Sequence, residues 1–131
     1  MSHRTIHIRG WRVDVFIEDG HHPEEVMECL EEMGAPNGIL ERAHGLIVEG
    51  NPNQAFTYSN GRRTVIWIGK TTSSEEFINS MIHELRHLVD HIAEYYGLDN
   101  NEAVGYLSGD AAFMLAEDIC EHGCRHCEKQ Q

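Results

Sequence analysis

The sequence has few basic residues. Lys and Arg together number 10 against 22 Asp and Glu, which gives a formal net charge of −12 with histidine counted as neutral. Nucleic acids and anionic membrane surfaces both attract basic protein faces, so this charge argues against either as the main partner. The acidic residues are spread along the chain. They therefore indicate a generally acidic surface.

Long apolar runs are also missing. No run approaches the roughly 20 apolar residues that a membrane-spanning helix needs. The first residues, Met1 to Thr5, are polar and lack the apolar stretch of a secretion signal, so we expect a cytoplasmic protein. Of the four cysteines, Cys29 stands apart and Cys120, Cys124 and Cys127 crowd near the end. That distribution is not the spread of a disulfide framework.

What remains is an ordinary soluble composition. The 131 residues are 40% hydrophobic and 24% charged, which is typical of a globular protein. A chain of this length is expected to form one domain with one core, without help from disulfides.

The first half of the chain mixes strand and helix patterns. Residues 5–18 alternate apolar and polar positions, with Gly10 as a bulge or a hairpin turn. An amphipathic helix is expected after Pro23, with Gly34 ending it. Residues 39–48 are ambiguous and are read as a second short helix.

A hairpin is strongly indicated in the middle of the chain. Residues 55–59 and 62–68 are strand-like and flank Asn60-Gly61, the pair preferred in a tight two-residue turn.

Two helices are expected after the hairpin. Ser73 with Glu76 forms a capping box for a helix over residues 74–96, and Gly97 ends it. Asn100 caps a second helix, predicted over residues 101–119. One apolar stripe follows the first helix at spacings of three and four: Phe77, Met81, Leu85, Leu88 and Ile92.

The first of these helices contains the pattern that carries chemistry, His83-Glu84-Leu85-Arg86-His87. Histidines four apart share a helix face, so both imidazoles can bind one zinc ion. Glu84 lies beside that site and can act as general base towards a water on the metal. The competing interpretation is a solvated helix face that carries His83 and His87 by chance in a chain with 10 histidines.

A catalytic zinc needs a third protein ligand and one open position. The candidates are Glu102, His91, Asp90 and Glu94. His91 lies two helical turns from His83, roughly 12 Å along the axis, and Asp90 and Glu94 lie on other faces or further away. Glu102 is favoured because it opens the next helix, which could fold back antiparallel over the His83/His87 pair.

These residues resemble the gluzincin (thermolysin-like) metallopeptidases, in which a His-Glu-x-x-His helix is followed by a helix carrying a glutamate. The resemblance implies His83, His87 and Glu102 as zinc ligands and Glu84 as general base. It also implies that a strand of the hairpin pairs with an extended substrate. The predicted fold is α+β, with a small antiparallel sheet whose hairpin packs against a long zinc-binding helix and a following antiparallel helix. The resemblance thus implies a minimal zincin over residues 1–120, of the kind found in small bacterial or phage-encoded proteins.

The chain departs from the family pattern in places. The acid expected four residues after the third ligand is replaced by Tyr106, and Asp110 is the alternative for orienting a zinc histidine. No motif identifies the group that would stabilise the oxyanion, for which Tyr95, Tyr96 and Tyr106 are candidates.

Residues 121–131 form a Cys/His-rich tail. With Cys120 just before it, the tail places Cys124 and Cys127 at knuckle spacing beside His122 and His126. A second zinc could bind there, but no second knuckle exists elsewhere, and a disordered, metal-binding tail is the favoured interpretation.

The sequence therefore predicts a zinc-dependent hydrolase, a small peptidase that acts on a peptide or protein substrate and not on nucleic acid or membranes. The alternative is a metal-binding interaction module with a structural or vestigial zinc site and no catalysis. Glu84 favours the enzyme, because a structural site has no need for a carboxylate beside an open coordination position.

Overall fold

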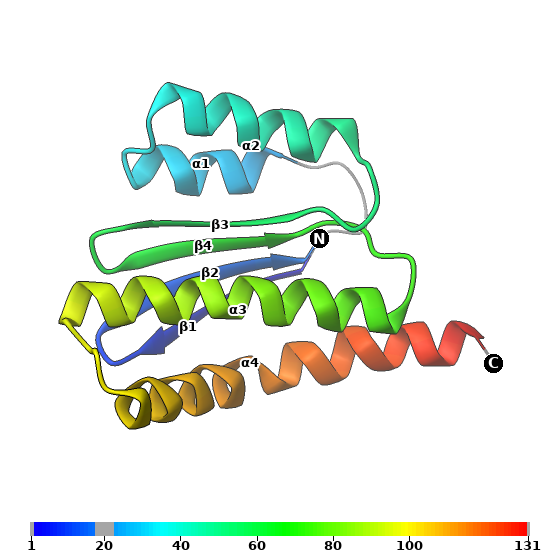
Figure 1. The fold of residues 1–131 in the computed structure, drawn as a ribbon. Coiled ribbons are helices and arrows are strands. Elements are labelled where there is room, and N and C mark those ends of the chain that lie inside the picture. The colour runs from blue at the N-terminus through cyan, green and yellow to red at the C-terminus, as the bar shows by residue number, and fades with distance from the viewer. Residues whose placement is uncertain (1, 18–22, 131) are drawn as a thin grey trace.

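The computed structural model describes residues 2–17 and 23–130, apart from the side chains of residues 2, 118 and 122–130. It is an α+β arrangement of one four-stranded sheet and helices (Figure 1). In chain order the elements are β1 (Ser2–Ile8), β2 (Trp11–Ile17), α1 (Glu24–Glu32), α2 (Asn37–Glu49), β3 (Ala55–Asn60), β4 (Arg63–Ile68), α3 (Ser74–Tyr96) and α4 (Asn101–Gln130).

The sheet is mixed, which corrects the prediction of an antiparallel sheet. Its strand order is β1-β2-β4-β3, and each hairpin is antiparallel, but the central strands β2 and β4 pair in parallel. The reason lies in the crossover: α1 and α2 run over and back across one face, so β3 starts at the end of the sheet where β2 finishes (Figure 1). The alternation of apolar and polar residues predicts which side chains share a face of a strand, but it does not predict whether the neighbouring strand runs parallel or antiparallel.

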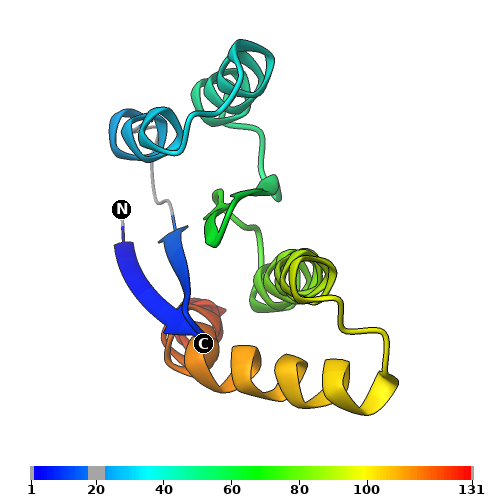
Figure 2. The same ribbon diagram turned by 90° about the vertical axis from the view of Figure 1, so that its left-hand side faces the viewer.

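The sheet lies between two pairs of helices, as Figures 1 and 2 show together. On one face, α3 and α4 pack against residues of β1, β2 and β4. On the other face, α1 and α2 pack over Phe16, Val65 and Trp67. The apolar stripe predicted on α3 is buried in the first of these cores, which confirms which side of that helix faces inward: Phe77, Met81, Leu85, Leu88 and Ile92.

The bounds of α3 are those predicted from its caps. The Ser73 side chain accepts a hydrogen bond from the backbone N–H of Glu76 at 3.1 Å. Gly97 ends the helix in the left-handed conformation, at φ 69°, which glycine adopts without a steric penalty. The histidine-bearing segment therefore lies in the middle of a helix anchored at both ends.

The last helix differs from the prediction in length and course. α4 continues to Gln130, beyond the expected end near Ile119. It packs against α3 and β1, but in Figure 2 its first half crosses away from the C-terminal end of α3 instead of running back along it. In the part of the chain that is described, no helix is both long enough and apolar enough to span a membrane.

One buried carboxylate, Asp14 on β2, is held by a polar network on the face that α1 and α2 cover. It accepts a hydrogen bond from Thr5 Oγ1 at 2.7 Å and lies 3.1 Å from His3 Nε2, 3.2 Å from Arg12 Nε and 3.4 Å from Arg63 Nε. Burial by itself raises the pKa of Asp14, but the hydrogen bonds from Thr5 and His3 and the charge of Arg12 outweigh it and lower that pKa.

Candidate metal centre

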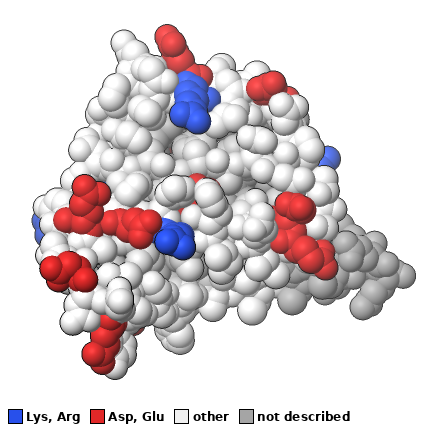
Figure 3. All heavy atoms as spheres, in the orientation of Figure 1, with Lys and Arg blue, Asp and Glu red and all other residues white. Residues whose placement is uncertain are grey.

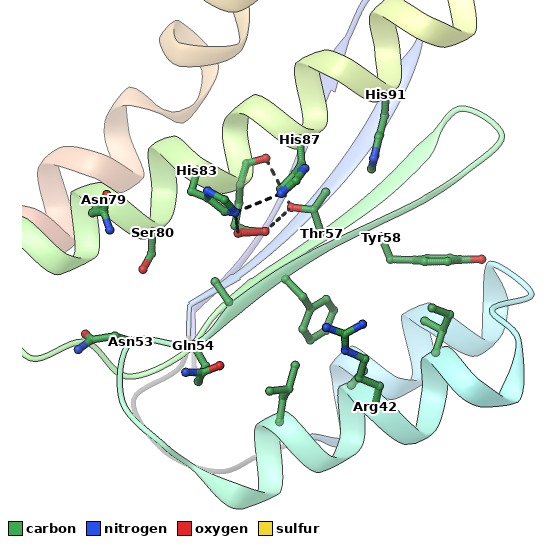
Figure 4. A pocket seen from close by; sticks show the side chains of 16 residues that line it. Arg42, Asn53, Gln54, Thr57, Tyr58, Asn79, Ser80, His83, His87 and His91 are labelled. Atoms are coloured by element: carbon green, nitrogen blue, oxygen red, sulfur yellow. Dashed lines mark hydrogen bonds and ion pairs between the residues drawn. The ribbon is translucent and has the colours of Figure 1, made fainter.

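A cleft of about 640 Å³ opens beside the edge strand β3, between α2 and α3 (Figure 4). Strand β3 forms the floor of this cleft. It is the edge strand of the sheet, and β4 pairs with one of its two edges. Side chains of α3 descend towards β3 from one wall and side chains of α2 rise from the other (Figure 4). The polar side chains that line it are Arg42, Asn53, Gln54, Thr57, Tyr58, Asn79, Ser80, His83, Glu84, His87 and His91.

The His83 and His87 rings converge at this wall of the cleft. Their Nε2 atoms lie 3.2 Å apart, and their rings are nearly perpendicular, at 84°. Two imidazole nitrogens that each bind one tetrahedral zinc ion at about 2.0–2.1 Å are about 3.3 Å apart. The separation therefore matches the bite of a zinc ion. The His83 side chain is 69% exposed, so the pair is open to the cleft.

Glu84 lies beneath this pair and is almost completely buried. Only 4% of the residue is exposed, and carboxylates are seldom buried this deeply in proteins. Its Oε1 accepts a hydrogen bond from Thr57 Oγ1 at 3.0 Å, and its Oε2 lies 4.0 Å from His83 Nε2 (Figure 4). A buried carboxylate with one hydroxyl partner has spare acceptor capacity facing the two imidazoles.

His91, one turn further along α3, lies apart from the pair. Its Nδ1 is 2.6 Å from Ser59 Oγ on β3, and its ring centre is 6.3 Å from that of His87. Burial lowers the pKa of His91, and the neighbouring His87 lowers it further, against the opposing effects of Asp90 and Glu94. His91 therefore lines the cleft as a neutral imidazole near neutral pH.

The structure does not bring Glu102 to the histidines. Glu102 lies in the exposed first turn of α4, and its backbone N–H donates to the Asn100 side chain at 2.8 Å. It is not among the residues that line the cleft. Among the side chains that the structure describes, no group of three or more His, Cys, Asp or Glu is placed to hold a metal ion. Glu102 as third ligand stays a prediction.

The other residues suggested from the sequence have partners away from the cleft. Asp110 pairs with Arg9 at 2.9 Å, and the Tyr96 hydroxyl donates to the Arg9 carbonyl at 2.9 Å. Tyr95 packs edge-on against Trp11, and Tyr106 is exposed. None of the three tyrosines lines the cleft around His83.

Sequence reasoning missed several of the residues that line the cleft. Tyr58 and Arg42 line the cleft, as does Asn79 one turn before His83. The alternation of side chains along β3 could have indicated the β3 residues of the cleft. Thr57 and Ser59 lie on the face of the strand that meets α3, whereas Tyr58 points to the opposite face. The sequence did not indicate that Arg42 would line a site, because the segment that carries it, residues 39–48, had no clear secondary-structure pattern.

The Cys/His-rich tail falls outside the described side chains, so its predicted zinc site is neither supported nor excluded. Cys120, just before it, is exposed.

Acidic side chains lie in separate groups over the face drawn in Figure 3, with few Lys or Arg side chains among them.

A comparison of the chain with known protein families, curated proteins and solved structures found no match. The function must therefore be inferred from the residues of the cleft themselves.

Proposed function

We propose that this protein is a zinc-dependent hydrolase, a small peptidase of the minimal gluzincin type. The observation that carries the proposal is the His83/His87 pair, with Nε2 atoms 3.2 Å apart, directly beside the buried carboxylate of Glu84 in an open cleft. Two histidine ligands at the spacing that zinc requires, with a general base beside them, are central parts of a site for amide hydrolysis by water, which also needs a third protein ligand.

The residues divide the chemistry between them. A bound zinc ion would supply Lewis acidity, lowering the pKa of water towards ~7 and polarising the substrate carbonyl. Glu84 accepts the proton of the attacking water and then delivers it to the leaving amine. Thr57 holds one carboxylate oxygen at 3.0 Å, which leaves the other turned towards His83.

Edge strand β3 supports a peptide as substrate. Among the described residues no strand pairs with its outer edge, and this edge forms the floor of the cleft. An extended peptide can add to such an edge through main-chain hydrogen bonds. Bound there, the peptide would pass directly beneath His83, Glu84 and His87.

Glu102 remains the proposed third ligand, on the strength of the family resemblance. Its exposed carboxylate has no partner among the described residues and is therefore free to bind a metal. Because it opens α4 at the end of α3 remote from the histidines, its binding would require the first turn of α4 to move. Metal binding commonly supplies the free energy for such ordering.

Zinc titration and peptide cleavage test the proposal. Equilibrium dialysis is performed in a Cys124→Ser/Cys127→Ser background, which removes the two cysteines at knuckle spacing from the predicted tail site. We expect one zinc per chain, lost in His83→Ala and in His87→Ala and retained in the control His44→Ala, whose imidazole is exposed on α2. A Glu102→Gln variant reports on the third ligand, through a loss of zinc affinity of about 10- to 100-fold.

The zinc-loaded protein should cleave fluorescently labelled casein, which has no fixed fold, and chelation should stop the cleavage. Zinc bound at His83 and His87 without cleavage of casein or short peptides would favour the alternative, an interaction module with a structural site. Absence of zinc binding in the cleft would overturn both.

A further inference from the structure

A chain of four hydrogen-bonded side chains leads from the sheet interior to the cleft. Trp11 Nε1 donates to Thr64 Oγ1 at 2.8 Å, Thr64 Oγ1 lies 2.6 Å from Ser59 Oγ, and Ser59 Oγ lies 2.6 Å from His91 Nδ1. Trp11 and Thr64 are buried, while Ser59 and His91 are partly exposed. The proposed hydrolysis does not use any of these residues.

Trp11, at the buried end of this series of hydrogen bonds, determines which group donates and which accepts at each step. An indole nitrogen can only donate, so the Thr64 oxygen accepts from Trp11. Among the described residues the Thr64 hydroxyl has no other acceptor than Ser59, so its proton points to Ser59. Ser59 must then donate to His91 Nδ1. The reverse direction would leave the fully buried Thr64 hydroxyl without an acceptor, at a cost in stability.

This direction determines the tautomer of His91. With Nδ1 accepting, the proton of the neutral ring resides on Nε2, which becomes a hydrogen-bond donor. His91 lines both the main cleft and a second hollow of about 340 Å³ beyond it, towards the β3–β4 turn. The Nε2–H group is thus the one polar function that His91 can offer to a ligand lying between the two hollows.

We propose that His91 binds a backbone carbonyl of the peptide substrate and sets its register, an inference that rests on the proposed hydrolase function. Glu84 meets β3 at Thr57 and His91 meets it at Ser59, two residues further along the same strand. An extended peptide on β3 rises about 3.3 Å per residue, so His91 reaches a carbonyl about two residues from the scissile bond. It therefore acts in substrate binding and not at the reacting carbon.

Peptide length provides the functional test. A model peptide is lengthened by about two residues at a time, at each end separately, and kcat and KM are measured for wild type, His91→Leu and His91→Gln. We expect wild-type kcat/KM to rise by about tenfold at the length that first reaches His91, through KM. His91→Leu loses this increase but matches wild type on shorter peptides. His91→Gln, whose amide keeps an N–H donor, retains much of it.

The tautomer is tested without substrate or metal, by ¹⁵N NMR of the His91 ring at about pH 8, where imidazoles are neutral. We expect the Nε2–H form in wild type, and in Ser59→Ala the loss of the signature of an Nδ1 that accepts a hydrogen bond. An Nδ1–H ring in wild type would overturn the inference.

The kinetic outcomes separate the two proposals. A protein that cleaves peptides but shows the same length dependence in His91→Leu as in wild type would overturn the role of His91 alone. A loss in His91→Leu that is equal for short and long peptides would do the same, since it indicates a structural effect. A zinc-loaded wild type that cleaves no peptide would overturn the hydrolase proposal, and the role of His91 with it.

Discussion

Two carboxylates are buried among the residues that the structure describes, Asp14 and Glu84, and their surroundings differ. Asp14, with no exposed area, is surrounded by Thr5, His3 and two arginines. Glu84, with 4% of its area exposed, has Thr57 as its hydrogen-bond partner and the His83 imidazole 4.0 Å away. Two arginines lie beside the Asp14 carboxylate, whereas no Lys or Arg among the described residues pairs with Glu84.

This difference indicates that Asp14 and Glu84 are buried for different reasons, one for stability and the other for function. A buried charge is costly unless it is paired, and Asp14 is paired so fully that its pKa is lowered despite burial. Asp14 therefore stabilises the junction of β1, β2 and β4. Glu84 has no such pairing with a cation in the described part of the chain, so its burial is best explained by what the cleft binds. Isosteric neutralisation of each carboxylate separates the two roles.

The largest expected effect is on catalysis, in Glu84→Gln. We expect casein cleavage to fall by about 10²–10⁴-fold, because the glutamine cannot accept the proton of the attacking water. Zinc binding and the free energy of unfolding should be retained, since the amide keeps the Thr57 contact and removes a buried charge. Cleavage rates at equal zinc occupancy measure this. Undiminished cleavage would remove Glu84 from the mechanism.

The matched variant Asp14→Asn should show the opposite pattern. Loss of the ion pairs with Arg12 and Arg63 is expected to lower the free energy of unfolding by about 1–3 kcal/mol, limited by the partial exposure of both arginines. Urea denaturation measures the change. Cleavage per folded molecule should stay within about twofold of wild type. A stable Asp14→Asn variant with impaired cleavage would contradict the division of roles.

The pH dependence of stability should depend on Asp14. Because its pKa is lower in the folded than in the unfolded chain, its contribution is present above the unfolded pKa, about 3.9. It is lost as the pH falls through the lower folded pKa. The stability difference between wild type and Asp14→Asn should therefore shrink below about pH 4, as urea midpoints at a series of pH values would show. A difference that does not depend on pH would mean that Asp14 is not charged in the native state.

A smaller effect is expected in Thr57→Val, which removes the hydroxyl that holds Glu84. Leaving a carboxylate oxygen without this partner should destabilise the fold by about 1 kcal/mol and reduce kcat by up to about tenfold through loss of orientation. The matched control is Thr72→Val, which removes a hydroxyl at an exposed contact with Asn53. Equal kinetics in the two variants would show that Thr57 does not position Glu84.

The sequence predicted the local parts of this structure well and its long-range parts poorly. The bounds of α3 follow from Ser73 and Gly97, because these caps act over a few residues. The β3–β4 hairpin was also predicted, but its two-residue turn is Gly61-Arg62 and not Asn60-Gly61, since Asn60 pairs with Arg63 at the end of β3. The parallel pairing of β2 with β4, the course of α4 and the contact of Ser59 with His91 all depend on how distant segments dock. No local pattern encodes that docking.

In the candidate site, too, the residues that are local in sequence were predicted and those that depend on long-range contacts were not. His83, Glu84 and His87 come from a single helix, so their spacing alone predicted their convergence. Glu102 depends on the angle at which α4 leaves α3, which the Gly97 turn does not specify. Asp14 was not predicted at all, because its partners come from three strands.

The most direct test of the central claim is to locate the metal by anomalous diffraction at the zinc edge, in crystals of the zinc-loaded protein. We predict one peak in the cleft, about 2.0–2.1 Å from Nε2 of both His83 and His87, with the Glu84 carboxylate close by but not bound to the ion. A cleft without a peak, or a zinc ion ligated by Glu84 itself, would contradict the account.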